Sequence, residues 1–548
     1  MPLQKNQVFT LRVERLSSDG SGVAHSPDGE TVFIPGAAPG DEARVRIVKD
    51  CKRYAFGILD EVLTPSPDRI PVDCAVAGPC GGCSLRHLDY AAELRAKQEN
   101  VADAFARIGG LDVPVLPIVG SPEVNRYRNK VQFPVGVDKS GKPCIGFYAG
   151  RTHRIVPCPD CRLQPGVLNE IGNALCAFFA EKGIQPYSEE TGRGLVRHIF
   201  LRRGAHSGQI MVCLVCTRAK LPSAEELCTR LKAQFAEITT ILLNVNAKNT
   251  NVILGTETHT LYGPGYIEDT LCGVPVQLGP LSFYQVNTLA AEQLYGIAAQ
   301  YAQLTPDDLL LDLYCGMGTI GLSMAAHCRE LIGVEIVPEA IESAKANAAR
   351  MGADVAAKSR FFCADAGQAA TRLAAEGLHP DIVMLDPPRK GCDEATLSAV
   401  VRMSPRRVVY VSCNPATAAR DAAWLEQNGY HAEKVQPVDL FPRTRHCEAV
   451  LLLTKLNVER HIEVDVSMDE LDVTAAESKA TYNEIRDYVW KHHQLKVSNL
   501  YIAQVKQKYS IIERENYNKA KNENAKQPKC PKEKEDAIVE ALKHFQMI

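Results

Sequence analysis

Residues 309–321 read LLLDLYCGMGTIG, and this stretch decides the fold. An apolar run of strand length leads into Gly316, Gly318 and Gly321, and a helix-like segment follows. Glycine lets the backbone approach a ligand closely, and a helix N-terminus offers free N–H groups. Glu335 ends the next apolar run, where a carboxylate can accept hydrogen bonds from both ribose hydroxyls. The pattern predicts a nucleotide-type cofactor, and it fits NAD and S-adenosylmethionine almost equally well.

The flanking sequence repeats this alternation of strand-like and helix-like segments. From about residue 271 the chain alternates helical segments with apolar runs of strand length, such as LIGVEI, DIVMLDPP and RVVYVSCNP. This alternation predicts a mostly parallel α/β sheet. We expect the last pieces, ending in EAVLLLTKL, to form an antiparallel edge.

Three strand ends carry side chains suited to chemistry. Residues 382–390, IVMLDPPRK, end a strand at Asp386, before two prolines that hold the turn stiff. The next strand ends at Cys413, and Glu448 immediately precedes AVLLLTK. A cysteine is more often a small buried hydrophobe, and Glu448 taken alone fits an exposed carboxylate. Because these strand ends face one ligand crevice in an open α/β sheet, we interpret Cys413 as a nucleophile and Glu448 as a candidate base.

One reaction needs these residue types together. C5 of uracil is too weak a nucleophile to take a methyl group directly. A thiolate that adds at C6 creates an enolate, whose C5 can attack a methyl sulfonium, and a base must then remove the C5 proton. The thiol therefore favours S-adenosylmethionine over NAD. A base inside folded RNA must also be exposed first.

The motifs LDLYCGMGTIG, LDPPRKG, SCNP, RHCEAV and FYQVN (283–287) resemble those of the bacterial RNA (uracil-C5)-methyltransferases. The resemblance covers roughly residues 1–456. It implies that Cys413 is the nucleophile and Glu448 the proton acceptor. Thr319 stands where many relatives have Asn, so that position carries less weight. The residues that the resemblance implies for S-adenosylmethionine are Gln285, Tyr314, Gly316, Gly318, Glu335, Asp365 and Asp386.

The chain is long enough for several domains. Residues 1–63 alternate apolar and polar positions in short runs broken by Gly and Pro, which predicts a small β-barrel, and the resemblance identifies it as an OB-like TRAM domain. We expect an α+β central RNA-binding domain at 70–270 and a Rossmann-like methyltransferase domain at 271–456. Residues 457–548 lie outside the resemblance and read as a helical C-terminal extension of open role, with a possible helix-turn-helix.

The cysteines form one notable group. Cys74-x5-Cys80-Gly-Gly-Cys83 is followed much later by Cys158-Pro-Asp-Cys161. Taken alone, four such thiols could bind zinc or an iron–sulfur cluster. The resemblance favours a [4Fe–4S] cluster on Cys74, Cys80, Cys83 and Cys161, with Cys158 as the alternative fourth ligand. Because methyl transfer moves no electrons, we expect this cluster to be structural or to position RNA.

The composition limits where RNA can bind. The chain has a formal net charge of −3, so it lacks the bulk basicity of many nucleic-acid binders, and any RNA site must be a local patch. A solvated charged face is the alternative explanation for each basic stretch. The candidate stretches are Arg126-Tyr127-Arg128-Asn129-Lys130 and the group Arg193, Arg197, His198, Arg202 and Arg203.

The resemblance also implies which RNA the protein methylates. Cluster-containing members of the family act on large-subunit ribosomal RNA, whereas its transfer RNA enzyme lacks the TRAM domain and the cluster. We therefore expect 23S rRNA first and tRNA second. The rival hypotheses are a non-catalytic RNA-binding or ribosome-assembly protein and an amino-group methyltransferase, which needs no thiol. Neither a signal peptide nor a membrane-spanning run is visible, so we expect a cytoplasmic protein, and we expect a monomer.

Overall fold

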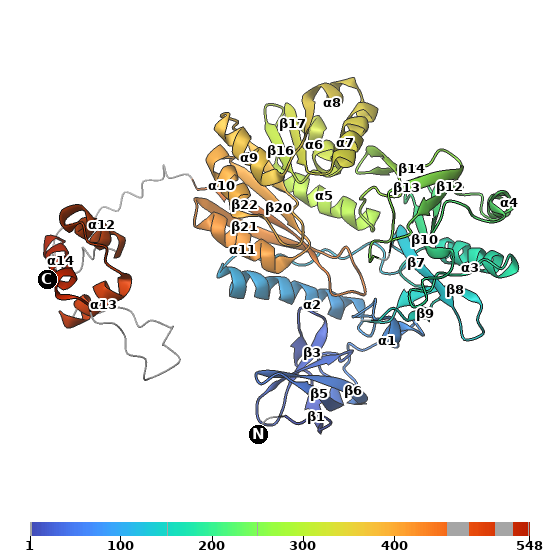
Figure 1. Ribbon diagram of the computed structural model, residues 1–548, viewed down its shortest axis with the longest axis horizontal. Helices are drawn as coiled ribbons and strands as arrows, with labels where there is room; N and C mark the ends of the chain where they lie inside the picture. The colour runs from blue at the N-terminus through green and yellow to red at the C-terminus, as the bar shows by residue number, and fades with distance from the viewer. Residues whose placement is uncertain are drawn as a thin grey trace. The chain divides into compact units, whose positions relative to one another are not determined.

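The computed structural model describes residues 3–150, 152–248, 250–456, 482–509, 530–545 and 547 (Figure 1). The chain divides into two compact units at residue 458. The domain divisions predicted at 63–70 and at 270 fall inside the first unit and stay predictions. Among the described helices, none is long and apolar enough to cross a membrane.

The N-terminal segment forms a six-stranded, mostly antiparallel sheet, which confirms the predicted arrangement of short strands. Strand β5 (Glu42–Asp50) shows the alternation best, because Ala43, Val45 and Ile47 are buried and their neighbours are not. At Gly57 a Cβ would lie 2.4 Å from Val45 Cγ1, so this sheet requires glycine there. The strand order is β1 (Val8–Arg12), β5, β6 (Tyr54–Thr64), β4 (Thr31–Pro35), β3 (Ser21–His25) and β2 (Arg15–Leu16).

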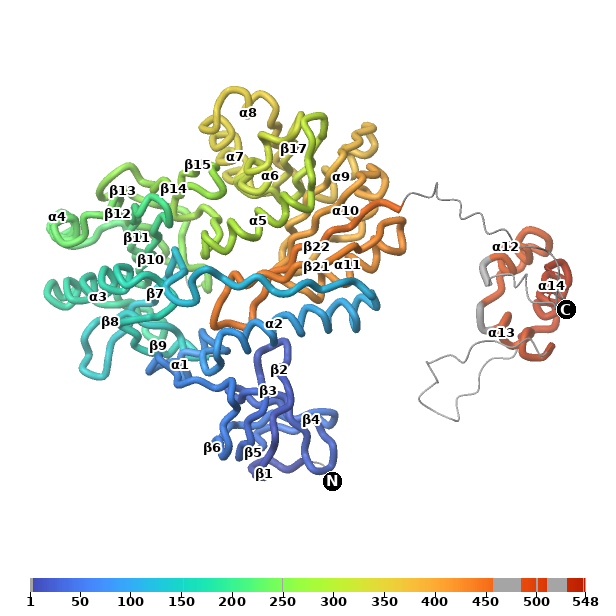
Figure 2. Tube along the Cα trace, turned by 180° about the vertical axis from the view of Figure 1, so that it is seen from behind, coloured from blue at the N-terminus to red at the C-terminus, as the bar shows by residue number. Residues whose placement is uncertain are grey.

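A long helix, α2 (Tyr90–Asp103), lies between this six-stranded N-terminal sheet, called the barrel below, and the sheet at the C-terminal end of the first unit (Figures 1 and 2). The helix begins where the Asp89 carboxylate accepts a hydrogen bond from the Ala92 N–H at 2.7 Å. It continues without a break into one π-helical turn, η1 (Ala104–Gly109). The short helix α1 (Ala77–Cys80) precedes it in the cysteine-rich segment.

The middle of the chain forms a seven-stranded sheet. Its inner strands include β10 (Val196–Arg203) and β11 (Ile210–Cys216), and helix α3 (Gly166–Glu181) shares an apolar core with them. The two strands are buried on both faces, because alternate residues of β11 join two different apolar cores. The order is β13 (Glu257–Tyr262), β12 (Ile238–Val245), β11, β10, β7 (Lys130–Val137), β8 (Pro143–Tyr148) and β9 (Ile155–Pro157), with α4 (Ala224–Gln234) beside α3 and the hairpin β14 (Ile267–Leu271) and β15 (Val274–Leu278) following.

The C-terminal sheet of the first unit confirms the predicted parallel α/β arrangement with an antiparallel edge. Its order reverses between β16 and β19, and ligands bind at such a switch point outside the carboxyl ends of the strands. From one edge to the other the strands are β18 (Ser359–Cys363), β17 (Glu330–Glu335), β16 (Leu309–Leu313), β19 (Ile382–Leu385), β20 (Arg407–Ser412), β22 (Glu448–Lys455) and β21 (Tyr430–Val438).

Helices cover both faces of this sheet (Figure 1). Helix α5 contributes to one apolar core and helices α9, α10 and α11 to the other. They are α5 (Thr288–Ala302), α6 (Thr319–Met324), η2 (Ala325–His327), α7 (Pro338–Met351), α8 (Ala353–Lys358), α9 (Ala366–Ala375), α10 (Glu394–Met403) and α11 (Pro415–Glu426).

The described part of the second unit consists of three helices, α12 (Tyr482–His493), α13 (Asn499–Lys508) and α14 (Lys532–His544). They share an apolar core that includes Ile485, Ile502 and Ile538. A short connection joins α12 to α13, as the sequence predicts for a helix-turn-helix. The remaining parts of the predicted extension, 457–481 and 510–529, lie outside the described residues.

Candidate active site

The glycine-rich loop adopts the backbone that the sequence predicts. Gly316 and Gly318 have φ of 55° and 79°, in the left-handed region that favours glycine, and α6 begins immediately afterwards. Tyr314 shares this conformation with φ of 67°, an uncommon state for a residue with a side chain. One oxygen of Glu335 accepts the Gly316 N–H at 3.2 Å and the other accepts the Val337 N–H at 3.0 Å. Loop and carboxylate therefore meet at the switch point of the sheet.

Two other predicted cofactor residues, Asp365 and Gln285, are each fixed by a hydrogen bond. Asp365 caps α9 by accepting the Gln368 N–H at 3.1 Å, directly after β18. The main-chain oxygen of Gln285 accepts a hydrogen bond from Asn129 Nδ2 at 2.8 Å, which ties the FYQVN segment to β7. Thr319 is buried, and its hydroxyl oxygen lies 3.3 Å from that of Tyr295, so it is part of the loop's packing.

Three carboxyl groups crowd the crevice. Burial raises the pKa of Asp312 and of Glu448 to about 8 each, and that of Asp386 to about 7. Asp386 adds to both of the other shifts, because like charges oppose ionisation. Asp312 accepts the Gly321 N–H at 3.0 Å through Oδ2, while its Oδ1 has no partner among the described atoms. This arrangement suits a ligand that brings a positive charge, such as a sulfonium.

The register of the sheet brings Cys413 and Glu448 together. Strand β20 pairs with β22 so that Ser412 faces Ala449. Extending this antiparallel register by one residue places Cys413 across from Glu448, the first residue of β22, and such neighbours have Cβ atoms about 5 Å apart. Burial raises the pKa of the Cys413 thiol, and Glu448 raises it further, as expected for adjacent groups.

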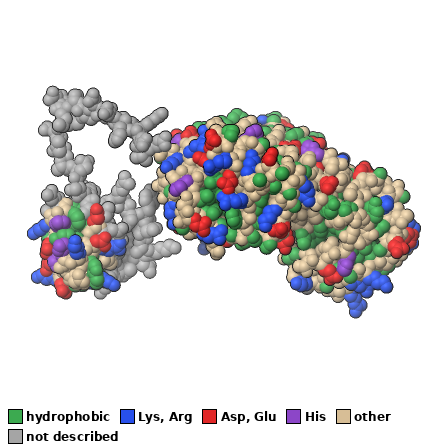
Figure 3. Space-filling model, turned by 90° about the horizontal axis from the view of Figure 1, so that it is seen from above, with side chains coloured by type: hydrophobic (Ala, Val, Ile, Leu, Met, Phe, Trp, Pro, Cys, Tyr) green, Lys and Arg blue, Asp and Glu red, His purple; other side chains and the backbone are tan. Residues whose placement is uncertain are grey.

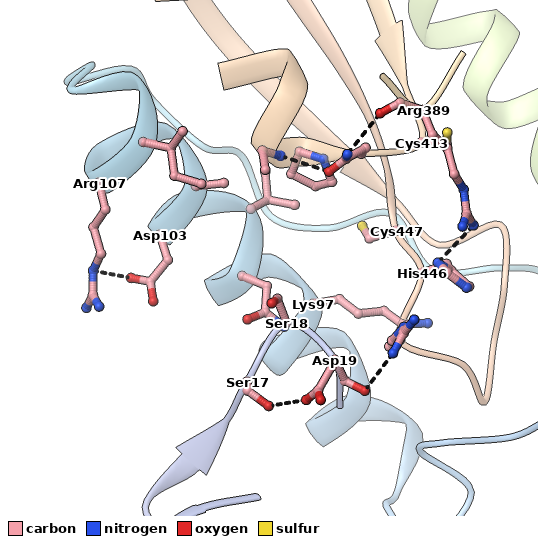
Figure 4. Close-up of a pocket in the computed structure, with 18 of the residues that line it drawn as sticks. Ser17, Ser18, Asp19, Lys97, Asp103, Arg107, Arg389, Cys413, His446 and Cys447 are labelled. Carbon is pink, nitrogen blue, oxygen red and sulfur yellow. Dashed lines mark hydrogen bonds and ion pairs between the residues drawn. The ribbon is translucent and has the colours of Figure 1, made fainter. Parts of the chain in front are cut away.

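Arg389 supplies positive charge beside this pair. Its guanidinium lowers the pKa of Cys413, against the larger effect of burial, and Nη2 lies 3.3 Å from His446 Nδ1. Its main-chain oxygen accepts a hydrogen bond from Asn414 Nδ2 at 3.0 Å, which ties the LDPPRK loop to the start of α11. Figure 4 shows Arg389 and Cys413 next to each other, with His446 at the end of the guanidinium.

A cavity of about 600 Å³ opens in front of Cys413. Its walls come from the turn between β2 and β3, the end of α2 with η1, the start of α11 and the loop before β22 (Figure 4). Arg445 Nη1 donates to the main-chain oxygen of Asp19 at 3.4 Å, so the turn between β2 and β3 contacts the loop before β22. The candidate nucleophile therefore lies in a cavity built from segments that are far apart in the sequence.

A buried ionic network holds the loop 439–447, which leads into Glu448. Lys97 Nζ on α2 lies 2.7 Å from Glu93 Oε1 and 2.7 Å from Asp439 Oδ1, and it donates to the Phe441 oxygen at 3.2 Å. Glu93 also accepts the Arg443 N–H at 2.7 Å. Sequence reasoning missed this network. The i,i+4 spacing of Glu93 and Lys97 on a helix face was the available signal.

Part of each basic stretch predicted to bind RNA is internal, which corrects both explanations for the buried residues, whereas Arg126, Arg128 and Lys130 are half-buried and stay candidates. Arg197, His198 and Arg202 are buried, because β10 is an inner strand of its sheet. Arg202 donates to the main-chain oxygens of Gly279 and Ser282 at 2.7 Å each, just before the FYQVN segment. In the other stretch, Tyr127 is also buried, and its hydroxyl donates to the Pro442 oxygen.

Figure 3 shows one face of the first unit. On that face of the first unit, basic and acidic side chains are interspersed. Arg193 stays exposed and Arg203 is half-buried. The arginines that line the cavity at Cys413 come instead from positions that the sequence did not single out for RNA binding, namely Arg15, Arg107, Arg389 and Arg445.

The cysteines predicted to hold a cluster lie near one another. Burial raises the pKa of the Cys80 thiol, and the nearby thiols of Cys161 and Cys74 raise it further. Cys83 is half-buried beside the same group, and Cys161 also contributes to its raised pKa. Cys158 is buried next to Cys161. Within the described residues, no three His, Cys, Asp or Glu side chains have the spacing that holds a metal ion, so the cluster and its fourth ligand stay predictions.

Comparison with known proteins agrees with this geometry. A family model described as tRNA (Uracil-5-)-methyltransferase matches residues 207–456, and a TRAM domain model matches residues 2–59. An uncharacterized RNA methyltransferase of Halalkalibacterium halodurans is 43% identical over 457 residues, covering 83% of this chain and 99% of the relative. One from Oceanobacillus iheyensis is 41% identical, covering 83% and 98%.

A solved structure is similar over most of the chain. It is the Pyrococcus abyssi tRNA (uracil-54, C5)-methyltransferase in complex with S-adenosyl-L-homocysteine. Its TM-score is 0.65 and its sequence identity 26%, and the alignment covers 82% of this chain and 100% of that one.

Proposed function

The chain belongs to the family of RNA (uracil-5-)-methyltransferases that use S-adenosylmethionine, and on that basis we propose that it methylates C5 of a uridine in 23S rRNA, with Cys413 as nucleophile and Glu448 as general base. One observation carries the assignment of roles. The register of β20 and β22 sets Cys413 across from Glu448, at the same edge of the sheet as the glycine-rich loop that follows β16.

The chemistry follows from these positions. The Cys413 thiolate adds to C6 of the uracil, which makes C5 nucleophilic, and C5 takes the methyl group. S-adenosylmethionine supplies that methyl group as an electrophile when it is bound. Glu448 then accepts the proton from C5, and the electrons of that C–H bond re-form the C5–C6 double bond as the thiolate leaves. Arg389 stabilises the thiolate before addition and after release.

The proposed cofactor contacts surround the loop. Glu335 would accept hydrogen bonds from the ribose, at the cost of its present bond to Gly316. Asp386 and the unpartnered oxygen of Asp312 would face the positively charged part of the ligand. Gln285, Tyr314, Gly318 and Asp365 complete the proposed set.

Trapping with RNA that carries 5-fluorouridine tests the roles, because fluorine replaces the C5 proton that Glu448 must remove. We expect a covalent adduct that survives denaturation with the wild type and is absent with Cys413→Ala. Methylation that persists undiminished in Cys413→Ala would overturn the assignment. A non-catalytic scaffold protein would give no adduct with either chain.

The 23S rRNA target rests on the resemblance, which associates the barrel and the cysteine group with the rRNA enzymes of the family. The runner-up is tRNA, because the similar solved structure is described as a tRNA enzyme. Mass-spectrometric mapping of 5-methyluridine in rRNA and tRNA, with and without the gene, separates the two. The proposal also includes a cytoplasmic location and a monomeric state.

The cysteine group is proposed to hold a [4Fe–4S] cluster on Cys74, Cys80, Cys83 and Cys161. The donor type supports the proposal, since iron–sulfur clusters prefer thiolates, and thiols from two separate segments lie near enough to raise one another's pKa. The group also adjoins the loop 439–447, because the Leu85 N–H donates to the Arg443 oxygen at 3.1 Å. Iron and sulfide quantitation in anaerobically purified Cys161→Ser and Cys158→Ser proteins tests the fourth ligand.

A further inference from the structure

The end of α2 presents an apolar side chain to the catalytic cavity. After Asp103 the helix continues as the π-helical turn η1, a rare geometry that occurs frequently at functional sites. Ile108 in this turn is 57% exposed, and Arg107 beside it is also exposed. Both side chains line the cavity that contains Cys413. The apolar surface of Ile108 is therefore available to a ligand in that cavity.

The charges on the same walls favour an anionic ligand. Asp103 lies 3.2 Å from Arg15 Nη1 and 3.3 Å from Arg107 Nε, so two guanidiniums share one carboxylate. Arg15 belongs to the barrel, which places it across from η1. Four arginines line the cavity against two aspartates, although the whole chain carries a net charge of −3. A local excess of positive charge of this kind is what attracts the phosphates of a nucleic acid.

The positions of the cavity walls favour an unpaired strand of nucleic acid over a duplex. Cys413 lies on one side of the cavity, and η1 and the barrel turn lie on others (Figure 4). A paired base is inside its duplex and cannot reach such a thiol, so the strand must be unpaired there. Proteins that hold a base out of its stack often place an apolar side chain against the neighbouring base, which replaces part of the lost stacking.

We propose that η1 is an RNA contact: Ile108 packs against the base next to the target uridine, and Arg107 and Arg15 bind the phosphates beside it. The inference rests on the proposed function and deepens it, because it names the side chains that hold the RNA beside the target uridine. It also gives the barrel a specific part in binding, as the wall that faces η1.

Binding of a short fluorescein-labelled oligouridylate to the full chain, measured by fluorescence anisotropy without S-adenosylmethionine, tests this proposal. We expect Ile108→Ala to weaken binding roughly fivefold, since part of an apolar side chain loses its contact. Val137→Ala is the matched control, because Val137 is 55% exposed on β7 and does not line the cavity. Arg107→Ala should reduce the slope of log Kd against log salt by about 0.7, the value for one phosphate contact on a single strand.

Two results would overturn the proposal. One is Ile108→Ala binding as tightly as Val137→Ala. The other is wild-type protein that binds the oligouridylate no better than the same strand annealed into a duplex. The adduct assay with 5-fluorouridine RNA tests the proposed function separately, because adduct formation depends on Cys413 and binding of the oligouridylate does not.

Discussion

Replacing Lys97 with methionine removes a buried ammonium from between two carboxylates. Burial disfavours its charge, but Asp439 and Glu93 raise the pKa of Lys97 above its usual value, so the ion pair forms in the folded protein. Both partners are fully buried, and methionine has a similar shape without the charge. Breaking a buried pair in this way costs about 3–5 kcal/mol, because the remaining charges lose their compensation. We expect a loss of that size in the free energy of unfolding at pH 8.

The loss should shrink as the pH falls. Burial raises the pKa of Glu93, and removal of Lys97 takes away a cation that opposes this shift. A carboxyl group whose folded pKa lies above its unfolded value binds a proton on folding, so the variant is least destabilised below the unfolded value, near 4.5. Its deficit against the wild type should grow as the pH rises from there through the folded pKa.

Urea unfolding followed by tryptophan fluorescence measures this effect. The chain has two tryptophans, so a Trp490→Phe background leaves Trp424 on α11 as the reporter of the first unit. Lys345→Met is the control, because Lys345 forms an exposed pair with Glu342 and should change stability by no more than about 0.5 kcal/mol. A Lys97→Met loss no larger than that of the control, at pH 8, would refute the reasoning.

Three further predictions concern the active site. Glu448→Gln keeps the shape of the base but cannot accept the C5 proton, so turnover should fall on the order of 100-fold. A methylated RNA adduct on Cys413 should then persist on denaturing gels. Undiminished turnover would contradict this role of Glu448. Because burial raises the pKa of Glu448 to about 8 and the base acts as a carboxylate, the rate at which methylated RNA is released from Cys413 should rise with pH through about 8, and a flat release rate from pH 6 to 9 would exclude that role. In Arg389→Met the pKa of Cys413 should rise, which slows its alkylation by iodoacetamide at pH 8 by about tenfold for each pKa unit. Mass spectrometry of the Cys413 peptide follows the alkylation. An unchanged rate would show that Arg389 does not stabilise the thiolate.

The local pattern of the sequence determined the elements and the cofactor loop. The apolar run before Gly316, the glycine spacing and the strand ends at Asp386 and Cys413 are short-range features, and each kept its predicted place. Side-chain periodicity and backbone preference act over a few residues, so they can be read without the fold. The parallel sheet with an antiparallel edge followed from the same signals.

Only the tertiary structure decided which distant residues meet. The sequence places Glu448 before a strand, but the register of β22 on β20 is what sets it across from Cys413. Exposure was decided in the same way: Arg202 looks like an RNA contact in the sequence and is buried, because β10 is an inner strand. Arg15 and Arg107 share Asp103, and Arg15 lies 88 residues from it in the chain. Register, burial and long-range ion pairs depend on how whole elements pack, and that information is spread over the chain rather than held in any one stretch of it.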